Sequence, residues 1–339
     1  MGVDLGDLFG RSSIALGQLS GKVVAVDAHN TLYQFLSVIR QPDGTPLMDS
    51  SGRVTSHLSG LIYRTTNMIE ARMRPVFVFD GKPPGMKEGT IKERRQVRAE
   101  AYRRWEEAKA AGSPDAFKYA QASSRLTGEI IEDAKNILGY MGVPCVQAPS
   151  EGEAQTAFMV RRGDAYCAAS QDYDSLLFGA TLLVRNLTVT GRRKLPGKNV
   201  YVNIEPEMIY LNDGLGKLQI TREQLVDIGI LVGTDFNEGI KGVGPKTALK
   251  LVKKHRSMAD ILKEQGKEID DYECIQQFFL SPEVTENYDL KVKVPNVDKI
   301  KEFLCEEHDF SADRVEKAIE RLVAASGAKA QKTLDRWFG

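Results

Sequence analysis

Lys22-Val-Val-Ala-Val-Asp27 and Arg74-Pro-Val-Phe-Val-Phe-Asp80 are two apolar runs that each end on an aspartate. Short continuous apolar runs are typical of strands that are buried on both faces of a parallel sheet. A helical pattern near residues 55–71 separates them, as a crossover between parallel strands requires. We therefore predict an α/β fold, with a central, mostly parallel twisted sheet that is flanked by helices.

The same alternation continues along the chain. Further elements are expected as strands at residues 143–147, 165–170 and 182–187, helices near 128–141 and 153–162, and a polar hairpin loop at 192–198. From residue 221 onward the pattern is mainly helical.

The composition is that of an ordinary globular protein, with 339 residues, 42% hydrophobic and 27% charged. No apolar run is long enough to cross a membrane, and Asp4 and Asp7 lie where a secretory signal would carry basic residues. We therefore expect a protein without membrane contact. The four cysteines are widely spaced, which argues against a disulfide framework and against a cysteine zinc site.

The net charge is formally zero, but the charges are unevenly distributed. Residues 82–104 contain eight Lys or Arg and three Glu, and residues 239–256 contain six Lys or Arg and no acid. Acids gathered around a metal and bases gathered for phosphate can cancel in the sum while lying apart in space.

Seven acidic residues lie at the ends of predicted strands or in turns. They are Asp27, Asp80, Glu151, Glu153, Asp172, Asp174 and Asp235. The carboxyl ends of parallel strands share one edge of a sheet, where ligands collect. Carboxylates gathered there repel one another, so the pattern implies a bound cation, and oxygen ligands favour Mg²⁺ or Mn²⁺ over zinc.

Two of the acidic stretches also have local interpretations. Ser150 and Glu153 have the spacing of a capping box, which leaves Glu151 unexplained. Asp172 and Asp174 point to one side and share a metal if the backbone is extended. They could instead form an Asx turn, or the nucleophile and acid of an Asp-x-Asp phosphatase.

Residues 87–111 predict a highly charged helix whose polar residues occupy most of its circumference. It is either a solvated surface helix or a basic helix that stands off the body and grips a phosphate backbone. The excess of basic residues favours the second interpretation.

Gly233-Thr-Asp-Phe-Asn237 leads into Gly239-Ile-Lys-Gly-Val-Gly-Pro-Lys-Thr-Ala248, which resembles a helix-hairpin-helix. Gly242 and Gly244 permit a tight turn, and Pro245 suits the first position of a helix. The free N–H groups of that helix bind a phosphate without reading bases, and positive charge comes from Lys241, Lys246 and Lys250. A P-loop is excluded because the spacing of the glycines is too short.

Five motifs resemble the flap endonuclease family in order and spacing. They are Val26-Asp-Ala28, Phe79-Asp-Gly-Lys-Pro-Pro84, Ser150-Glu-Gly-Glu-Ala154, Ser170-Gln-Asp-Tyr-Asp174 and Gly233-Thr-Asp-Phe236 with its hairpin. The resemblance covers nearly the whole chain and is nearest to archaeal and eukaryotic replication enzymes. His29-Asn30 departs from the small or apolar residues expected after Val-Asp-Ala.

The resemblance implies a structure-specific 5′ nuclease that acts on flaps in Okazaki-fragment maturation and base-excision repair. All seven carboxylates would hold or support two Mg²⁺ ions, with Mn²⁺ as a substitute, for hydrolysis to a 5′-phosphate and a 3′-hydroxyl. Asp80, Glu153, Asp172 and Asp174 would lie closest to metal, with Asp27, Glu151 and Asp235 acting partly through water. The hairpin residues also permit a K⁺ ion.

The resemblance also makes residues 82–130 a helical arch through which a 5′ single strand passes. Lys87 and Arg94 match two basic catalytic residues that face the scissile phosphate, and Lys82 and Arg95 are expected to contact DNA. Tyr33 matches an aromatic that stacks on a base near the cut. A core tyrosine is a nearly equal interpretation of that position.

Gln331-Lys-Thr-Leu-Asp-Arg-Trp-Phe338 resembles a sliding-clamp binding box. With Gln331 ahead of them, Leu334, Trp337 and Phe338 would share one face of a short helical turn and anchor it in a pocket of the clamp. The alternative is a terminal helix that folds onto the body. No long basic extension follows, which favours an archaeal enzyme that works in the cytoplasm at the nucleoid over a eukaryotic nuclear one.

We expect one nuclease domain over residues 1–330 and a clamp-binding tail at 331–339, working as a monomer on branched DNA. The expected parts of the domain are an N-terminal nuclease region at 1–98, the arch at 82–130, an internal nuclease region at 131–256 with the hairpin near 239–256, and a helical region at 257–330. The alternatives are a related 5′ nuclease for bubbles, nicks or four-way junctions, and a clamp-tethered DNA-binding scaffold without catalysis.

Overall fold

The computed structural model describes residues 2–188, 191–194, 201–255 and 257–327. Seven strands form one sheet in the order β1-β9-β6-β5-β2-β3-β4, and a separate two-stranded sheet contains β7 and β8. The strands are β1 Ser12–Ser13, β2 Val23–Asp27, β3 Arg74–Phe79, β4 Cys145–Gln147, β5 Cys167–Ala169, β6 Leu182–Arg185, β7 Gly191–Lys194, β8 Tyr201–Ile204 and β9 Glu207–Tyr210.

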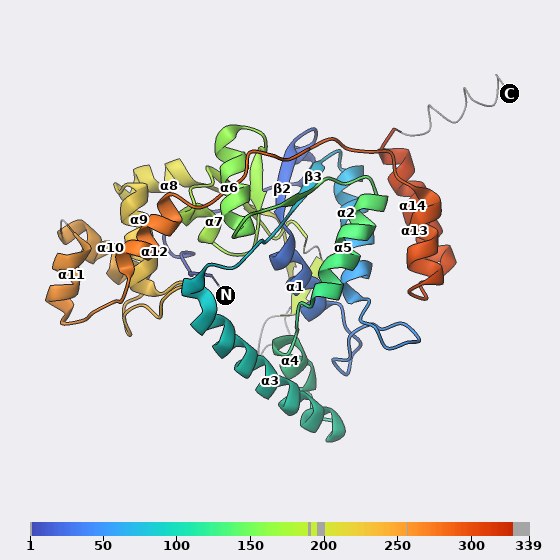
Figure 1. Cartoon of the computed structure of the whole chain (residues 1–339), viewed down its shortest axis with the longest axis horizontal. Helices are drawn as coiled ribbons and strands as arrows, with labels where there is room; N and C mark the ends of the chain where they lie inside the picture. The colour runs from blue at the N-terminus through green and yellow to red at the C-terminus, as the bar shows by residue number, and fades with distance from the viewer. Residues whose placement is uncertain (1, 189–190, 195–200, 256, 328–339) are drawn as a thin grey trace.

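The described helices cover both faces of the large sheet and extend beyond it (Figure 1). The α-helices are α1 Ala28–Val38, α2 Ser56–Glu70, α3 Glu88–Ala110, α4 Ala116–Ala122, α5 Gly128–Tyr140, α6 Gly152–Arg162, α7 Asp174–Leu177, α8 Leu211–Leu218, α9 Arg222–Val232, α10 Pro245–Lys254, α11 Met258–Gln265, α12 Tyr272–Leu280, α13 Val297–Lys301 and α14 Ala312–Ala325. Short 3-10 turns lie at η1 Leu16–Leu19 and η2 Gly85–Lys87, and a π-helical turn at η3 Glu302–Glu306. None of these helices is long and apolar enough to cross a membrane.

The predicted α/β fold with a mostly parallel sheet is confirmed. The neighbours β4, β3, β2, β5 and β6 run parallel, and β9 and β1 add an antiparallel edge. The sequence pattern missed β1, β8 and β9, because such short strands carry little apolar periodicity. The loop expected at 192–198 is wrong for its first residues, since Arg192–Lys194 pair with β8, and residues 195–198 lie outside the described part.

Side chains of each central strand alternate between two cores, one on each face of the sheet. Val24 and Val26 belong to a core with α1, α2, α5 and α14, whereas Ala25 belongs to a core with α6, α9 and α12. This two-sided burial explains why β2 reads as a continuous apolar run. Because β2 pairs in parallel with both β3 and β5, the carboxyl ends of the three strands lie side by side at one edge.

The expected arch helix is present as α3, which projects from the body in Figure 1. Most of its side chains are exposed, including Val97 and Tyr102. Its far end packs with α4 in a small separate core of Trp105, Ala116 and Ala120. The helix therefore stands off the body, and this small core holds its far end against α4.

The packing of α9 on α12 gives one prediction about stability. Gln276 Nε2 donates a hydrogen bond to Asp227 Oδ1 at 2.6 Å, and burial raises the pKa of Asp227 to about 6. Because this pKa lies above the usual 3.8, the ionised form destabilises the fold above pH 6, and the cost fades as the pH falls toward 4. We expect Asp227→Asn to raise the free energy of unfolding by about 1–2 kcal/mol at pH 8, after allowing for partial solvent screening.

Urea unfolding at pH 8 and pH 4.5 checks this expectation, with the exposed Asp213→Asn on α8 as a control. An equal gain at both pH values would contradict the ionisation argument.

Candidate active site

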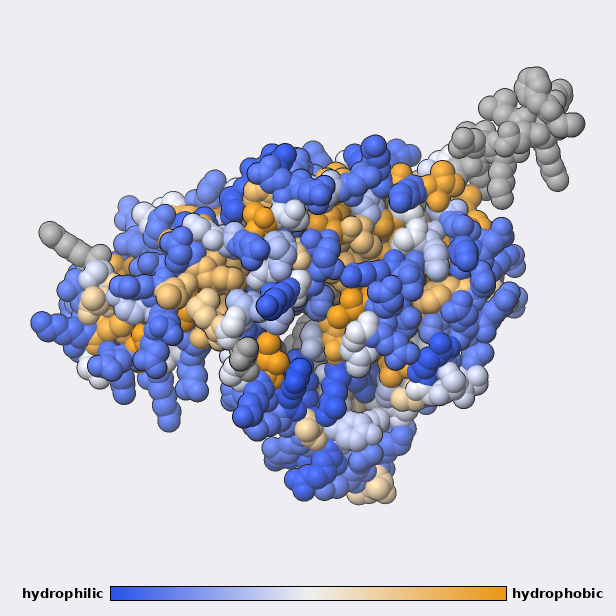
Figure 2. Space-filling view, viewed as in Figure 1, coloured by the Kyte–Doolittle hydropathy of each residue, from blue (hydrophilic) through white to orange (hydrophobic). Residues whose placement is uncertain are grey.

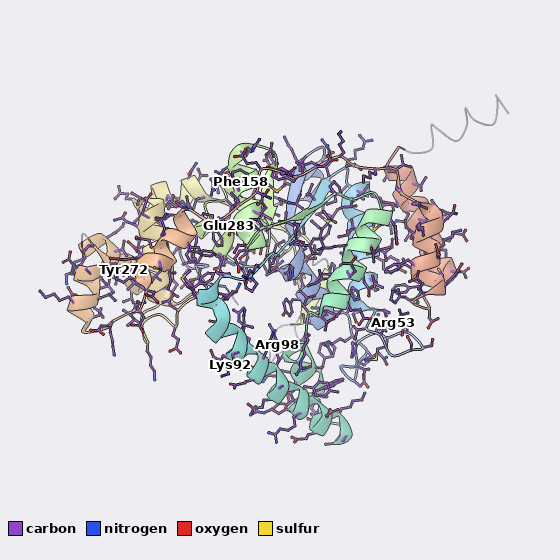
Figure 3. The ribbon with its side chains drawn as sticks, viewed as in Figure 1. Arg53, Lys92, Arg98, Phe158, Tyr272 and Glu283 are labelled. Atoms are coloured by element: carbon purple, nitrogen blue, oxygen red, sulfur yellow. The ribbon has the colours of Figure 1, made fainter. Side chains whose placement is uncertain are left out.

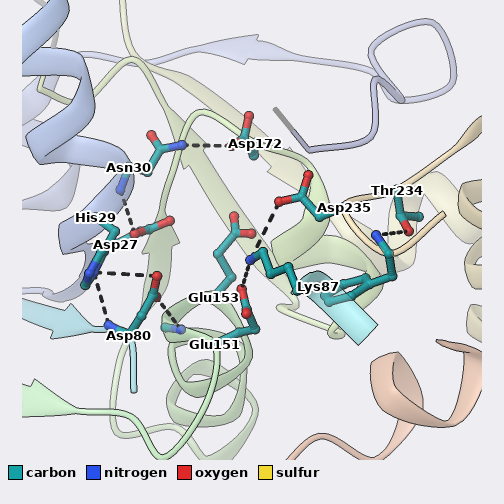
Figure 4. A network of polar contacts seen from close by, with 12 residues as sticks. Asp27, His29, Asn30, Asp80, Lys87, Glu151, Glu153, Asp172, Thr234 and Asp235 are labelled. Atoms are coloured by element: carbon teal, nitrogen blue, oxygen red, sulfur yellow. Dashed lines mark hydrogen bonds and ion pairs between the residues drawn. The ribbon is translucent and has the colours of Figure 1, made fainter. Parts of the chain in front are cut away.

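Six of the seven predicted carboxylates lie at the carboxyl edge of the sheet, and loop 233–244 brings the seventh, Asp235, to them. Figure 4 labels all of them except Asp174. Asp27 is the last residue of β2, Asp80 follows β3, and Asp172 and Asp174 follow β5. Glu151 and Glu153 lie at the start of α6. Five of the seven lie close enough to raise the pKa of another member: Asp27, Asp80, Asp172, Asp174 and Asp235.

The capping box expected for Ser150 and Glu153 is wrong. The N-cap of α6 is Glu151, and no side chain caps it. Glu153 Oε1 instead accepts hydrogen bonds from Ser170 Oγ at 3.0 Å and Ser175 Oγ at 3.2 Å. The carboxylate of Glu153 therefore faces the site rather than its own helix end.

Asp172 and Asp174 lie close together without an extended backbone. Residues 171–173 form a bend, and α7 begins at Asp174. Asn30 Nδ2 donates to Asp172 Oδ2 at 2.9 Å, and the Val3 N–H donates to Asp174 Oδ1 at 2.8 Å. The bend, rather than strand alternation, turns both carboxylates into the cluster.

Glycine at two motif positions allows the backbone to come close to Asp80. The Gly152 N–H donates to Asp80 Oδ1 at 2.8 Å, and a Cβ on Gly152 would lie 2.7 Å from that oxygen. A Cβ on Gly81 would lie 2.2 Å from the Ala148 carbonyl oxygen. These contacts give a steric reason for the glycines of Phe79-Asp-Gly and Glu-Gly-Glu.

Burial and mutual repulsion raise the pKa of most of these groups. Burial raises the pKa of Asp174 to about 8, and the Asp235 and Asp172 carboxylates add to this. Burial also raises the pKa of Asp27 and of Glu153 well above their usual ranges, with Asp80 and Asp174 respectively as the next cause. The cluster thus favours a bound positive charge.

Two basic side chains from the base of the arch enter the cluster. Lys87 Nζ lies 2.6 Å from Glu151 Oε2 and 3.7 Å from Asp235 Oδ2, and Arg94 pairs with Asp235. Burial opposes the charge of Lys87, but the Glu151, Asp235 and Asp80 carboxylates together outweigh burial and raise the pKa of Lys87. Burial likewise opposes the charge of Asp235, yet Arg94 and Lys87 lower the pKa of this carboxyl.

The donor set fits divalent metal because it consists of carboxylate oxygens with excess negative charge. In the described part of the chain, no three or more His, Cys, Asp or Glu side chains are arranged to hold an ion as they stand. Lys87 lies between Glu151 and Asp235, and the Asn30 amide lies against Asp172. Bound ions would therefore compete with Lys87 for these oxygens.

Sequence reasoning missed two polar residues that organise the site. Asn30 donates its backbone N–H to Asp27 Oδ1 at 3.0 Å and its amide to Asp172, thereby linking two strand ends. His29 Nδ1 accepts the Asp80 N–H at 3.1 Å, and burial lowers the pKa of His29. Their departure from the expected small residues at this turn was the available signal.

The expected DNA contacts fall into two groups. Lys82 and Arg95 are exposed near the base of the arch. Tyr33 is half-buried on α1, and the guanidinium of Arg98, which Figure 3 labels on α3, lies 4.8 Å from its ring centroid. Tyr33 therefore lies at the rim rather than inside the core. A hollow of about 610 Å³ lies between the base of α3 and residues 232–238.

The second group lies around the start of α10. Pro245 is the first residue of this helix, as expected, Gly244 is its N-cap, and Gly242 has a φ of +90° that a non-glycine residue rarely adopts. The side chains of Lys241, Lys246 and Lys250 are exposed there. The four residues expected to bind the clamp, Gln331, Leu334, Trp337 and Phe338, lie outside the described residues.

Family models match two stretches of the chain, the XPG N-terminal domain at residues 7–101 and the XPG I-region at residues 142–235. Flap endonuclease 1 of Methanosarcina acetivorans is 59% identical, with both chains covered in full, and that of Archaeoglobus fulgidus is 57% identical, again in full. The chain belongs to the flap endonuclease family. As a family member it is a nuclease, which excludes the Asp-x-Asp phosphatase and the scaffold without catalysis.

Solved structures of other nucleases have the same fold as this chain. Flap endonuclease-1 from Methanococcus jannaschii superposes with a TM-score of 0.77 at 40% identity, covering 97% of this chain and all of the other. Human GEN1 in complex with Holliday junction DNA gives a TM-score of 0.69 at 21% identity, covering 96% and 78% of the two chains. That second likeness shows a shared fold.

One packing contact in the nuclease predicts an effect on activity at a residue outside the acidic motifs. A Cβ on Gly2 would lie 2.6 Å from Asp174 Oδ2, and the Val3 N–H and burial hold that carboxylate in place. We expect Gly2→Ala to displace Asp174 and lower the cleavage rate about tenfold, because small displacements in an active site are costly.

Cleavage kinetics and thermal unfolding of Gly2→Ala check this, with Gly17→Ala as the control because a Cβ there meets no atom within 4 Å. A full cleavage rate in Gly2→Ala would show that Asp174 tolerates the shift.

Proposed function

We propose that this nuclease cuts branched DNA where a 5′ single strand leaves the duplex, as a monomer in the cytoplasm of an archaeon at the nucleoid. The observation that carries the proposal is the contact of Lys87 and Arg94, at the base of the arch, with Glu151 and Asp235 in the carboxylate cluster. A strand that passes under the arch therefore meets the acidic residues directly. Its roles would be Okazaki-fragment maturation and base-excision repair.

We further propose that the seven carboxylates hold two Mg²⁺ ions, for which Mn²⁺ can substitute. When bound, such ions activate water and stabilise the oxygen that leaves. The chain's own residues do the positioning: Asn30 and His29 orient Asp172 and Asp80, and Ser170 orients Glu153. Lys87 and Arg94 supply the positive charge that draws the scissile phosphate to the cluster.

Two sets of residues would hold the DNA on either side of the cut, one near the arch and one at the α9–α10 segment. Lys82, Arg95 and Tyr33 lie near the arch, and Tyr33 would exchange the Arg98 guanidinium for a nucleobase. The α9–α10 segment would act as a helix-hairpin-helix, in which Lys241, Gly242, Gly244, Lys246 and Lys250 hold the phosphates of the duplex. A K⁺ ion in that hairpin would be compatible with the same role.

The domain plan follows from these roles. Residues 1–330 would form one nuclease domain, made of the N-terminal region 1–98, the arch at 82–130, the internal region 131–256 and the helical region 257–330. Residues 331–339 would bind a sliding clamp.

The test is Mg²⁺-dependent cleavage of an end-labelled double-flap DNA whose 5′ end is either free or blocked by a bulky adduct. We expect cutting near the branch only when the end is free, because a blocked strand cannot pass under α3. Equal cutting of both substrates would overturn threading and favour a nuclease for junctions or bubbles. Absence of any cutting would overturn the proposed substrate.

Deletion of residues 331–339 is expected to leave cleavage without the clamp unchanged and to remove stimulation by the clamp. The aromatic pair in this segment is the proposed anchor, and loss of such an anchor removes most of the binding energy. Steady-state cleavage with and without clamp measures both values. Stimulation that survives the deletion would place clamp binding elsewhere.

A further inference from the structure

A second hollow, of about 220 Å³, lies at the opposite edge of the sheet from the carboxylates. Its walls come from the end of α2, the start of β3, the residues before β4, the end of α14, and an extended strap at residues 281–296 that joins α12 to α13. The lining is largely apolar: Ile69, Met73, Pro75, Met141, Val143 and Leu322 among others. We call this hollow the strap groove.

Backbone hydrogen bonds hold the strap against the end of α5 and the turn that follows it. The Lys293 N–H donates to the Gly142 carbonyl at 2.9 Å, and the Asn296 N–H donates to the Tyr140 carbonyl at 2.8 Å. A Cβ on Gly142 would lie 2.1 Å from the Lys293 carbonyl oxygen, so the strap lies directly on this turn. Val292 lines the groove and Val294 does not, although both are exposed, by 51% and 66%.

Cations surround the apolar lining. Arg72, Arg74 and Lys293 border the groove with exposed side chains, and no acidic residue lines it. Within the described residues, none of these three side chains has a recorded hydrogen bond or ion pair. Cations without a partner among the described residues, next to exposed apolar surface, match an acidic segment with an apolar anchor.

The groove also lies where the proposed clamp-binding tail begins. Ala325 and Ser326 line it, and the last described residue is Gly327. In Figure 2, hydrophobic side chains gather at the edge of the molecule where Figure 1 shows the end of α14. Residues 328–339 carry three basic residues and one acid, so their charge does not match that of the rim. The groove therefore suits a different chain better than it suits the tail.

We propose that the strap groove is a second docking site for the protein that the tail binds, and that it takes an acidic segment with an apolar anchor from that partner. The inference rests on the proposed clamp-binding role of the tail. A partner held by the tail has a high effective concentration at the groove, so a weak second contact adds to the overall affinity and orients the nuclease on its partner.

The experiment compares sliding-clamp binding by four forms of the full chain: wild type, Val292→Asp, Val294→Asp and the deletion of residues 331–339. Val292→Asp puts a negative charge in the groove, and Val294→Asp puts the same charge two residues along the same strap. Both positions are exposed, so neither variant is expected to unfold. We expect Val292→Asp to weaken binding roughly tenfold, the scale of one interface residue. Val294→Asp should bind as the wild type does.

Wild-type affinity in Val292→Asp, or equal losses in both valine variants, would overturn the strap groove. The deletion of residues 331–339 tests a different point. Unchanged clamp binding by the deletion would show that the tail is not the clamp-binding segment, whatever the two valine variants show. A charge-reversed Arg74→Glu should also weaken binding, more at low salt than at high salt, because salt screens exposed charges. An effect that does not depend on salt would contradict the role of the basic rim.

Discussion

Replacing Asp172 by Asn is expected to lower the rate of DNA cleavage more than ~100-fold, since even outer-shell partners of metal ligands matter on that scale. The substitution keeps the shape of the side chain and removes its negative charge. Asp172 lies among the other carboxylates, and burial raises its pKa. The lost charge therefore weakens the attraction for cations at the centre of the proposed site.

DNA binding should change little in Asp172→Asn, because removing a negative charge does not weaken contacts with phosphate. Single-turnover cleavage of a double-flap DNA and binding in Ca²⁺ buffer separate the two properties. Asp213→Asn, an exposed aspartate of α8, is the matched control and should cut at the normal rate. A normal rate in Asp172→Asn would refute the proposed role of this carboxylate.

Replacing Lys87 by Ala is the second large effect, an expected loss of about 10²–10³-fold in turnover. Lys87 Nζ contacts Glu151 and lies near Asp235, and its side chain is only 14% exposed. Removing it takes away a positive charge that the scissile phosphate would meet and leaves two neighbouring carboxylates less compensated. The loss should appear in kcat more than in KM.

Lys87→Arg tests whether charge alone is sufficient, and it should recover only part of the rate because guanidinium is larger and planar. Lys263→Ala, an exposed lysine of α11, is the matched control. A normal kcat in Lys87→Ala would mean that this lysine only pairs with Glu151. In that case the arch would contribute to substrate passage and not to the reaction.

The acidic cluster could be predicted because it depends on strand ends. Once Val23–Asp27 and Arg74–Phe79 are parallel neighbours, Asp27 and Asp80 must emerge at one edge of the sheet. Apolar run length and the position of the last residue are local properties of the chain. The helical arch could be predicted for a similar reason, since its charge excess and helix-forming residues are contiguous.

Contacts between distant segments could not be predicted. Asn30 reaches Asp172 across 142 positions, and the N–H of Val3 reaches Asp174 across 171. A capping box at Ser150 was a sound local interpretation, yet Glu153 bonds Ser170 and Ser175 from other elements. Tertiary hydrogen bonds replaced the local one because they satisfy a carboxylate that is buried in the site.

The sequence by itself determined the α/β class, the strands that lead into aspartates, and the carboxylate character of the site. These properties follow from apolar periodicity and residue type, which act over short distances along the chain. Only the tertiary structure decided that Lys87 lies between Glu151 and Asp235, that Arg98 covers Tyr33, and that Arg72, Arg74 and Lys293 surround one apolar groove. Those arrangements depend on how separate elements pack, and the packing angles are set by many side chains together.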